Sequence, residues 1–168
     1  MSALRLVLTL LAVAHASAYD RSVSPNGEFE AYTTANFPDG GGMKLFLRRA
    51  NARDTGVLLA QNARWIDAKW SPDSRFLAVI NHPDGHIADV YVFGVTAANA
   101  AASRSVTLLY HTPNPLTYDV RWDVAGWHAE KREVILKQEV RDQNAGTHAT
   151  HTVIAQIGAK PLKFELPR

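Results

Sequence analysis

The sequence predicts an all-β protein in which an antiparallel four-stranded meander is repeated about three times. Three observations carry this prediction: a turn-and-strand phrase that occurs three times, a tryptophan pair that recurs at one spacing, and a polar turn at the matching place of each unit. Repetition at a period of about 50 residues is typical of stacked-sheet arrays, because a single repeat cannot bury its apolar face alone.

The repeated phrase is a tight polar turn followed by a strand of small and large apolar residues. Its clearest copy occupies residues 70–79 and reads Trp-Ser-Pro-Asp-Ser-Arg-Phe-Leu-Ala-Val. A weaker copy occupies residues 23–32, and a more eroded one occupies residues 127–136. Pro72 and Asp73 belong to the turn, where we expect the Asp73 carboxylate to accept hydrogen bonds from backbone N–H groups.

The four tryptophans form two pairs at the same offset from the phrase. Trp65 and Trp70 precede the second copy as Trp-x4-Trp, and Trp122 and Trp127 precede the third in the same way. Aromatic side chains that recur with a structural repeat normally fill the gap between neighbouring sheets. We therefore expect structural roles for all four, with Trp70 and Trp127 largely buried. A sugar-stacking platform is the alternative.

Each unit is expected to contain four strands, the first ahead of the phrase turn and the second after it. A second turn with Gly or Asn then leads to a third strand, since such residues supply the backbone angles of tight hairpins. These second turns are at residues 36–40, 81–85 and 142–146. The third strands are at residues 44–48, 89–93 and 152–157, and the fourth at 56–60, 105–110 and 162–166.

The phrase resembles the TolB-like, WD-like β-propeller repeat, whose signature is Trp-Ser-Pro-Asp-Gly, a strand, a polar turn and a Tyr-Val strand. Residues 70–93 carry the resemblance best, and it extends over roughly residues 20–166. The first copy lacks the Trp and has Asn26 in place of Asp, while the third has lost Ser-Pro. The resemblance implies a propeller-like fold and a role in binding. It implies no catalytic residues, because the family shares no single chemistry.

Three blades do not form an ordinary closed propeller, since closed rings typically have 4–8 blades. The sequence therefore predicts an open arc of about three blades or a ring completed by oligomerisation. A β-sandwich or a small barrel is the alternative fold.

The N-terminal residues have the pattern of a signal peptide. Arg5 supplies a basic start, residues 6–14 an apolar run, and Ala16-Ser17-Ala18 a small-x-small cleavage site. We expect residues 1–18 to be removed and residues 19–168 to form a single periplasmic or secreted domain. The apolar run is shorter than the roughly 20 residues that span a bilayer, so we expect no stable membrane insertion. The sequence contains no Cys, which excludes disulfides.

The charge pattern argues against nucleic-acid binding. Eighteen basic and 16 acidic residues give a net charge of +2, and the basic residues are scattered rather than clustered along a stripe. We instead expect a protein partner or a homo-oligomer, because an unclosed stack leaves one face of each terminal sheet uncovered. The residues expected to make poor caps are Phe29, Ala31, Leu45, Leu47, Val57, Leu59, Val134, Leu136, Val153, Ile154 and Leu162.

Histidines supply the candidate ligand site. The connections between second and third strands, and between units, lie on one face of a propeller-like array. This places His82, Asp84, His86, His111 and His148 on or near that face. Imidazole suits Zn, Cu or Ni, so these residues are a candidate site for a divalent transition metal, although no cofactor is required. The alternative is that polar loops simply contain histidine.

No catalytic constellation is recognisable. The chain has no Cys, no Gly-x-Ser-x-Gly elbow and no Gly-rich phosphate loop between a strand and a helix. The sequence therefore favours a non-enzymatic binding or interaction module. A metal-binding or hydrolytic periplasmic protein that uses the His-bearing face is the alternative.

Overall fold

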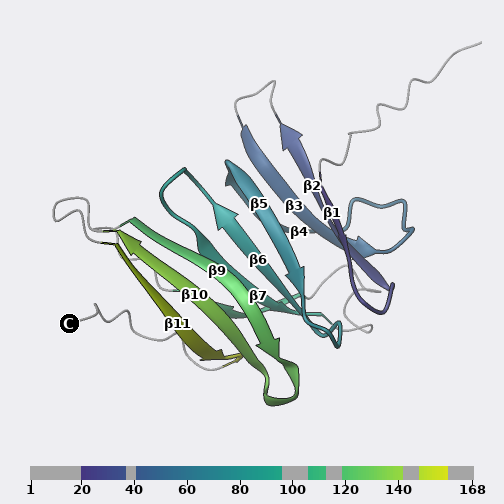
Figure 1. The fold of residues 1–168 in the computed structure, drawn as a ribbon. Helices are drawn as coiled ribbons and strands as arrows, with labels where there is room; N and C mark the ends of the chain where they lie inside the picture. Colours follow the sequence, from purple (N-terminus) through teal and green to yellow (C-terminus); the bar gives the residue numbers. More distant parts are fainter. Residues whose placement is uncertain (1–19, 37–40, 96–105, 113–118, 142–147, 159–168) are drawn as a thin grey trace, which may run out of the picture.

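The computed structural model describes residues 20–36, 41–95, 106–112, 119–141 and 148–158 (Figure 1). Strands make up almost all of the regular structure in these ranges, which confirms the all-β class. No helix among the described residues has the length and apolarity needed to cross a bilayer. The expected signal peptide, residues 1–18, lies outside the described residues.

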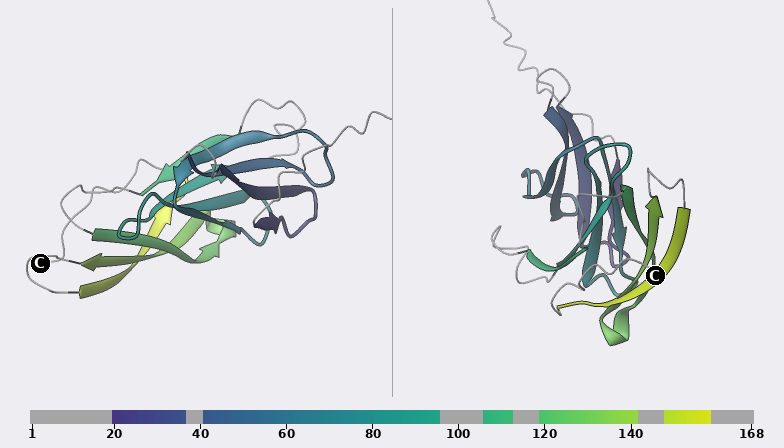
Figure 2. Two further views of the ribbon diagram at one scale, coloured as in Figure 1. Left: turned by 90° about the horizontal axis from the view of Figure 1, so that it is seen from above. Right: turned by 90° about the vertical axis from the view of Figure 1, so that its left-hand side faces the viewer.

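Three antiparallel sheets stand side by side in chain order and form an open row (Figures 1 and 2). The first contains β1 (Arg21–Val23), β2 (Phe29–Asn36), β3 (Gly41–Arg49) and β4 (Val57–Ala63). The second contains β5 (Trp65–Trp70), β6 (Phe76–His82), β7 (Asp89–Gly94) and β8 (Thr107–His111). The third contains β9 (Asp119–His128), β10 (Glu133–Arg141) and β11 (His148–Gln156), with the short 3-10 turn η1 (Ala129–Lys131) between β9 and β10.

The four-stranded meander is confirmed in the first two units. In the third, the described residues form three strands, and the expected fourth strand at residues 162–166 lies outside them. Because the sheets remain separate and do not close, the propeller-like open arc describes the arrangement.

The first two phrase turns are built by the same hydrogen bonds. In each, the serine hydroxyl accepts the backbone N–H five residues later, at 3.0 Å for Ser24 and 2.9 Å for Ser71. The same hydroxyl donates to Asn26 Oδ1 at 2.7 Å or Asp73 Oδ1 at 2.6 Å. Asn26 and Asp73 each accept a further backbone N–H two residues later, at 3.1 Å. The expected role of Asp73 is thereby confirmed.

The third turn has the same length but a different shape. Arg132 N donates to Ala129 O at 3.0 Å, and Arg132 has a left-handed backbone with φ of 55°. In the second copy the left-handed residue is Ser74, which comes three residues before Leu77, the partner of Trp70. In the third copy Arg132 comes only two residues before Val134, the partner of Trp127. Without a serine hydroxyl to hold it, the third turn becomes a 3-10 turn.

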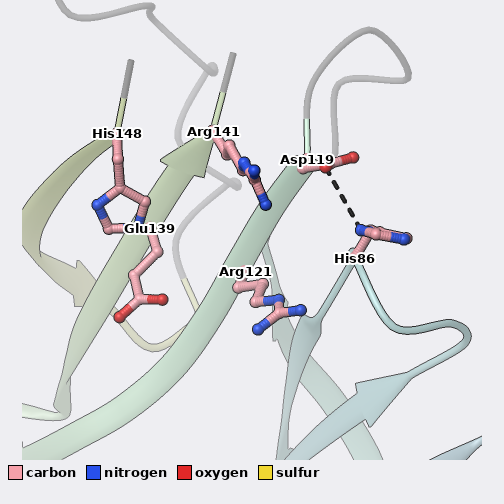
Figure 3. A pocket seen from close by; sticks show the side chains of 6 residues that line it. All are labelled: His86, Asp119, Arg121, Glu139, Arg141 and His148. Carbon is pink, nitrogen blue, oxygen red and sulfur yellow. Dashed lines mark ion pairs between the residues drawn. The ribbon is translucent and has the colours of Figure 1, made fainter. Parts of the chain in front are cut away.

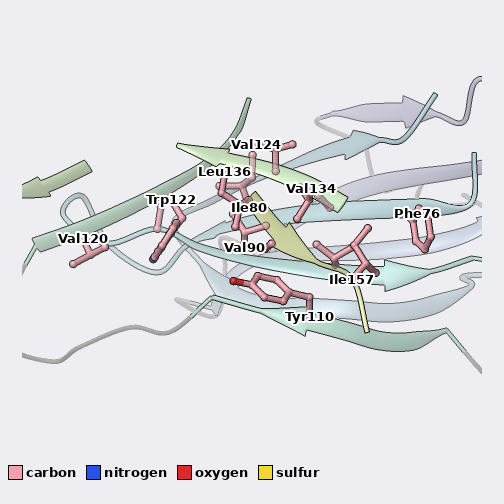
Figure 4. Close-up of a cluster of buried hydrophobic side chains, with 14 of the residues drawn as sticks. Phe76, Ile80, Val90, Tyr110, Val120, Trp122, Val124, Val134, Leu136 and Ile157 are labelled. Atoms are coloured by element: carbon pink, nitrogen blue, oxygen red, sulfur yellow. The ribbon is translucent and has the colours of Figure 1, made fainter. Parts of the chain in front are cut away.

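Two apolar junctions hold the three sheets together. Side chains alternate along β6, so Leu77 and Val79 pack toward the first sheet while Phe76, Ala78 and Ile80 pack toward the third. The first junction contains Phe29, Ala31, Leu45, Leu47, Ala63, Ile66, Leu77, Val79, Phe93 and Val95. The second is drawn in Figure 4 and includes Phe76, Ile80, Val90, Val92, Tyr110, Val120, Trp122, Val124, Val134 and Leu136. The second sheet is therefore covered on both faces.

A tryptophan-on-phenylalanine stack recurs at both junctions. Trp70 stacks on Phe29 of the preceding unit with ring centroids 6.5 Å apart, and Trp127 stacks on Phe76 at 6.3 Å. The Trp70 indole N–H also donates to Ser22 O at 3.2 Å. These contacts give Trp70 and Trp127 the structural role that the repeat predicts. Both rings are half-buried rather than largely buried, because each lies at the margin of its junction.

The other two tryptophans are not equivalent to each other. A β-bulge in β9 skips Ala125, so residues before the bulge change face relative to those after it. Trp122 consequently points into the second junction and is 4% exposed. β5 is regular, and Trp65 lies on the opposite face from Trp70 with 36% of its surface exposed. Trp65 thus differs from the expectation that all four rings fill gaps between sheets.

The free face of the first sheet combines a buried ion-pair network with apolar side chains, of which Val23 is 47% exposed and Leu58 is 44% exposed. Phe29, Ala31, Leu45 and Leu47 lie in the first junction. The opposite face carries the buried Glu30 carboxylate, paired with the guanidinium groups of Arg21 and Arg48. On the same face Tyr32 and Phe46 stack at 5.6 Å. Side chains alternate along each strand, so the residues of the first junction point inward and Glu30, Tyr32 and Phe46 point outward.

The third sheet has a charged free face with one large exposed apolar side chain. Val134 and Leu136 are buried in the second junction, and Val153 packs against it. Ile154, in contrast, is 55% exposed. Leu162 lies outside the described residues. Most of the residues expected to be poor caps therefore face inward, and the partner or second copy stays a prediction.

Candidate functional site

A large hollow lies between the first strands of the second and third sheets. It has a volume of about 410 Å³. Because β5 alternates, Trp65, Asp67 and Lys69 face this cleft while Ile66 and Ala68 pack toward the first sheet. The remaining lining residues are Ile80, His82, Arg121, Trp122, Asp123, Lys137 and Glu139.

An aromatic platform forms one wall of the cleft. The exposed Trp65 ring stacks on the His82 imidazole, with centroids 4.4 Å apart and an angle of 25° between the planes. The Arg64 guanidinium lies 5.8 Å from the Trp65 ring centroid, and His82 Nε2 lies 3.4 Å from Asp67 Oδ2. Burial lowers the pKa of His82, while the neighbouring Asp67 carboxylate acts in the opposite direction. The neutral imidazole is therefore favoured in the platform.

Ion pairs hold the charged side chains of the cleft in place. Lys69 Nζ bridges the two sheets, donating to Asp123 Oδ1 at 2.8 Å and to Val124 O at 3.0 Å. Lys137 Nζ donates to Glu139 Oε1 at 2.5 Å. This last hydrogen bond raises the pKa of Lys137 and lowers the pKa of Glu139. The Glu139 carboxylate therefore stays charged at neutral pH, and the ion pair with Lys69 orients Asp123.

A smaller pocket of about 130 Å³ adjoins the cleft. It is lined by His86, Asp119, Arg121, Glu139, Arg141 and His148 (Figure 3). Arg121 and Glu139 line both hollows, so the two form one continuous surface. In Figure 3 the guanidinium ends of Arg121 and Arg141 lie between His148 and Glu139 on one side and His86 and Asp119 on the other.

The turn between β6 and β7 positions His86 at the pocket. The Asp84 carboxylate accepts the backbone N–H groups of His86 at 2.6 Å and Ile87 at 2.8 Å. The hydrogen bond from His86 is the main cause of a lowered pKa of Asp84. Arg121 donates to Gly85 O, which ties this turn to β9. The turn is thus fixed from both ends.

The predicted histidine face is brought together only in part. His86 and His148 share the pocket and His82 lies in the adjoining cleft, whereas Asp84 uses its carboxylate inside its own turn. His111 stacks on Tyr91 at 4.2 Å and lines neither hollow. Across the described ranges, no three His, Asp or Glu side chains are grouped so as to hold a metal ion. The transition metal therefore remains a prediction.

The arginines and acids of the site were not singled out from the sequence. The sequence feature that could have identified them is the alternation of charged residues, which occupy every second position along two neighbouring strands. These residues are Asp119, Arg121 and Asp123 on β9, and Lys137, Glu139 and Arg141 on β10. This pattern predicts a charged sheet face. It does not predict that β5 contributes side chains to the same hollow.

The sequence matches no protein-family model and no curated protein. Among solved structures, the chain is similar to the β-propeller domain of the Trilobed protease from Pyrococcus furiosus, with 14% identity and a TM-score of 0.42. The similarity covers 79% of this chain and 42% of that chain, so this protein spans less than half of the neighbour's length. The repeated sheets and turns described above, rather than this likeness, establish the propeller-like arrangement.

Proposed function

We propose that the protein is an exported, non-enzymatic binding module of the TolB-like propeller type, and that its ligand lies in the cleft between β5 and β9. The observation that carries this proposal is the exposed Trp65 ring, stacked on His82 in a hollow of about 410 Å³. Binding sites typically combine a concave surface with aromatic walls and a few fixed polar groups. The cleft has each of these features.

The state of the acids supports binding rather than hydrolysis. A hydrolytic general acid needs a carboxyl group whose pKa is raised, so that it holds a proton at neutral pH. In this site the pKa of Glu139 is lowered by its hydrogen bond to Lys137. Asp123 is paired with Lys69 at 2.8 Å. Asp67 is near His82, at 3.4 Å. The charges are arranged to hold one another and to orient a ligand.

Export is supported by the order of basic start, apolar run and Ala16-Ser17-Ala18 in the sequence. Expression with export from a bacterial host, followed by intact-mass spectrometry of the exported fraction, tests it. We expect a mature chain that begins at Tyr19. An exported chain that retains Met1 would contradict this part of the proposal.

Ligand binding in the cleft is tested by following the four indole N–H signals in nuclear magnetic resonance spectra. Neutral oligosaccharides, short mixed-charge peptides and phosphorylated small molecules would be added in separate titrations. We expect at least one class to shift the Trp65 signal in a saturable way, and Trp65→Ala to abolish that binding. Leu108→Ala, which removes a half-exposed side chain on β8, is the matched control. No saturable shift of any cleft residue would refute the proposed site.

The expected partner protein or second copy is part of the same proposal. Its support is the third sheet, where Ile154 is 55% exposed on a face that no other described sheet covers. Light scattering on the mature chain at tens of micromolar tests self-association. A dimer that Ile154→Lys dissociates would support a second copy, whereas a monomer of unchanged mass would leave only a different protein as the partner.

A further inference from the structure

We propose that the smaller pocket binds a phosphate group, with Arg121 and Arg141 as its principal ligands. The inference rests on the proposed binding function and names the ligand chemistry of the same continuous surface. The phosphate is either free phosphate or a phosphate ester whose remaining part extends into the adjoining cleft.

Four basic side chains from four segments converge on this pocket. His86 comes from the turn between β6 and β7, Arg121 from β9, Arg141 from β10 and His148 from β11 (Figure 3). Strand pairing within the third sheet brings Arg121, Arg141 and His148 together. His86 joins them because the second sheet packs against the third. A guanidinium presents planar paired N–H donors that match phosphate oxygens.

The two acids of the pocket already have other partners. Asp119 Oδ2 lies 3.5 Å from His86 Nδ1, and Glu139 Oε1 accepts Lys137 Nζ at 2.5 Å. Among the described residues, no carboxylate lies within ion-pairing distance of Arg121 or Arg141. Two guanidinium groups are therefore left to attract an anion from solution.

Arg121 is held in place without using up its donors. One N–H of its guanidinium donates to Gly85 O, and the side chain carries five N–H donors in all. The backbone of Arg121 is also fixed, because Arg121 and Ala88 form a β-bridge. In this bridge Ala88 N donates to Val120 O at 3.1 Å, and Trp122 N donates to Ala88 O at 3.0 Å. A positioned guanidinium loses less conformational entropy on binding than a free one.

The size of the pocket favours a compact tetrahedral group. A volume of about 130 Å³ accommodates one phosphate group but no sugar or nucleoside attached to it. The larger cleft begins at the shared residues Arg121 and Glu139 and contains the Trp65 platform. A phosphate ester would thus place its anionic end between the arginines and its apolar or ring-shaped end toward Trp65.

Isothermal titration at constant ionic strength tests this inference, with inorganic phosphate, phenyl phosphate and sodium benzoate as probes. We expect both phosphates to bind with one site per chain, and Arg141→Gln to weaken them about tenfold, the loss expected for one charge-assisted contact. Arg53→Gln is the matched control, because it removes the same charge from an exposed loop of the first sheet. Thermal melts establish that each variant is folded.

The outcomes separate the inference from the proposed function. Equal weakening by Arg141→Gln and Arg53→Gln, or no phosphate binding while another ligand shifts Trp65, would overturn the phosphate site and leave the cleft standing. Phosphate binding lost in Arg141→Gln, with no ligand that shifts the Trp65 signal, would support the phosphate site and refute the cleft.

The two organic probes test where the rest of the ligand lies and how selective the site is. If phenyl phosphate binds more tightly than inorganic phosphate, and Trp65→Ala removes only this extra affinity, the phosphate site and the cleft are both supported. Benzoate binding as tightly as phenyl phosphate would show a general anion site and overturn the assignment to phosphate.

Discussion

β5 and β9 have the same Trp-x4-Trp spacing, yet they use their tryptophans differently. β5 is a regular strand, so Trp65 and Trp70 lie on opposite faces, one in the cleft and one in the first junction. The bulge at Ala125 gives β9 one extra residue, so Trp122 and Trp127 both face the second junction. A single backbone insertion therefore decides whether a recurring tryptophan serves packing or is available to a ligand.

The same comparison extends to the hollows beside these strands. Where β5 meets β1 the space is only about 10 Å³ and is lined largely by small or apolar side chains such as Ala31, Ile66 and Ala68. Where β5 meets β9 the space is about 410 Å³ and is lined by charged residues and Trp65. Equivalent positions in the array thus differ because the two faces of β5 carry different residue types.

Deletion of Ala125 should have the largest effect, because it would make β9 as regular as β5. Val120, Trp122 and Val124 would then turn out of the second junction unless the pairing slips. Each buried side chain of this size contributes about 1.5–3 kcal/mol, so we expect a loss above about 5 kcal/mol, comparable to the whole stability of a small domain. Urea denaturation followed by circular dichroism measures it, with Ala125→Gly as the control that keeps the bulge. A deletion variant as stable as wild type would show that the bulge does not set the face of Trp122.

Truncation of one aromatic residue in each region should separate packing from binding. Phe29→Ala empties a site that is 2% exposed in the first junction, so we expect it to cost about 3–5 kcal/mol in unfolding free energy. Trp65→Ala removes an exposed ring, and we expect a cost below about 1 kcal/mol together with loss of ligand binding. Parallel urea melts check the difference. Equal costs would mean that Trp65 is a core residue and not a platform.

The two matching phrase turns should respond alike to loss of their hydroxyls. Ser24→Ala and Ser71→Ala each leave a buried backbone N–H without its acceptor, at a cost of about 1–3 kcal/mol. Because both networks have the same geometry and differ only in that Asn26 offers an amide oxygen where Asp73 offers a carboxylate, the two costs should agree within about 1 kcal/mol. Thermal and urea melts of the two single variants provide the comparison. A large cost at only one serine would show that the turns are alike in geometry but not in energy.

The smallest effect should appear in the dependence of stability on pH. Burial lowers the pKa of His82 in the folded state, so the unfolded chain binds a proton more readily. The contribution of neutral His82 is therefore present above the ordinary imidazole pKa and is lost as pH falls below it toward the lowered value. His82→Gln should flatten this part of the profile, measured by urea melts from pH 8 to pH 5. Identical profiles for the variant and wild type would rule out His82 as the source.

The sequence by itself determined the number of units, the order of their strands and the chemistry of their turns. These features depend on local rules: a serine hydroxyl caps a turn at Ser24 and Ser71, and apolar and polar residues alternate along a strand. The same alternation explains why Leu45 and Leu47 face inward on a terminal sheet, although both are among the residues expected from the sequence to make poor caps. Alternation shows that two faces differ, but which face is covered depends on the neighbouring sheet.

Only the tertiary structure decided which side chains form the site. The bulge at Ala125 arises where pairing with β10 and packing on the second sheet must be satisfied together, and no local residue pattern specifies it. The convergence of His86 with His148, and the Lys69–Asp123 pair, likewise depend on how one sheet is placed against the next. Such contacts join residues far apart along the chain, so their positions follow from the summed packing of both sheets rather than from the spacing of any motif.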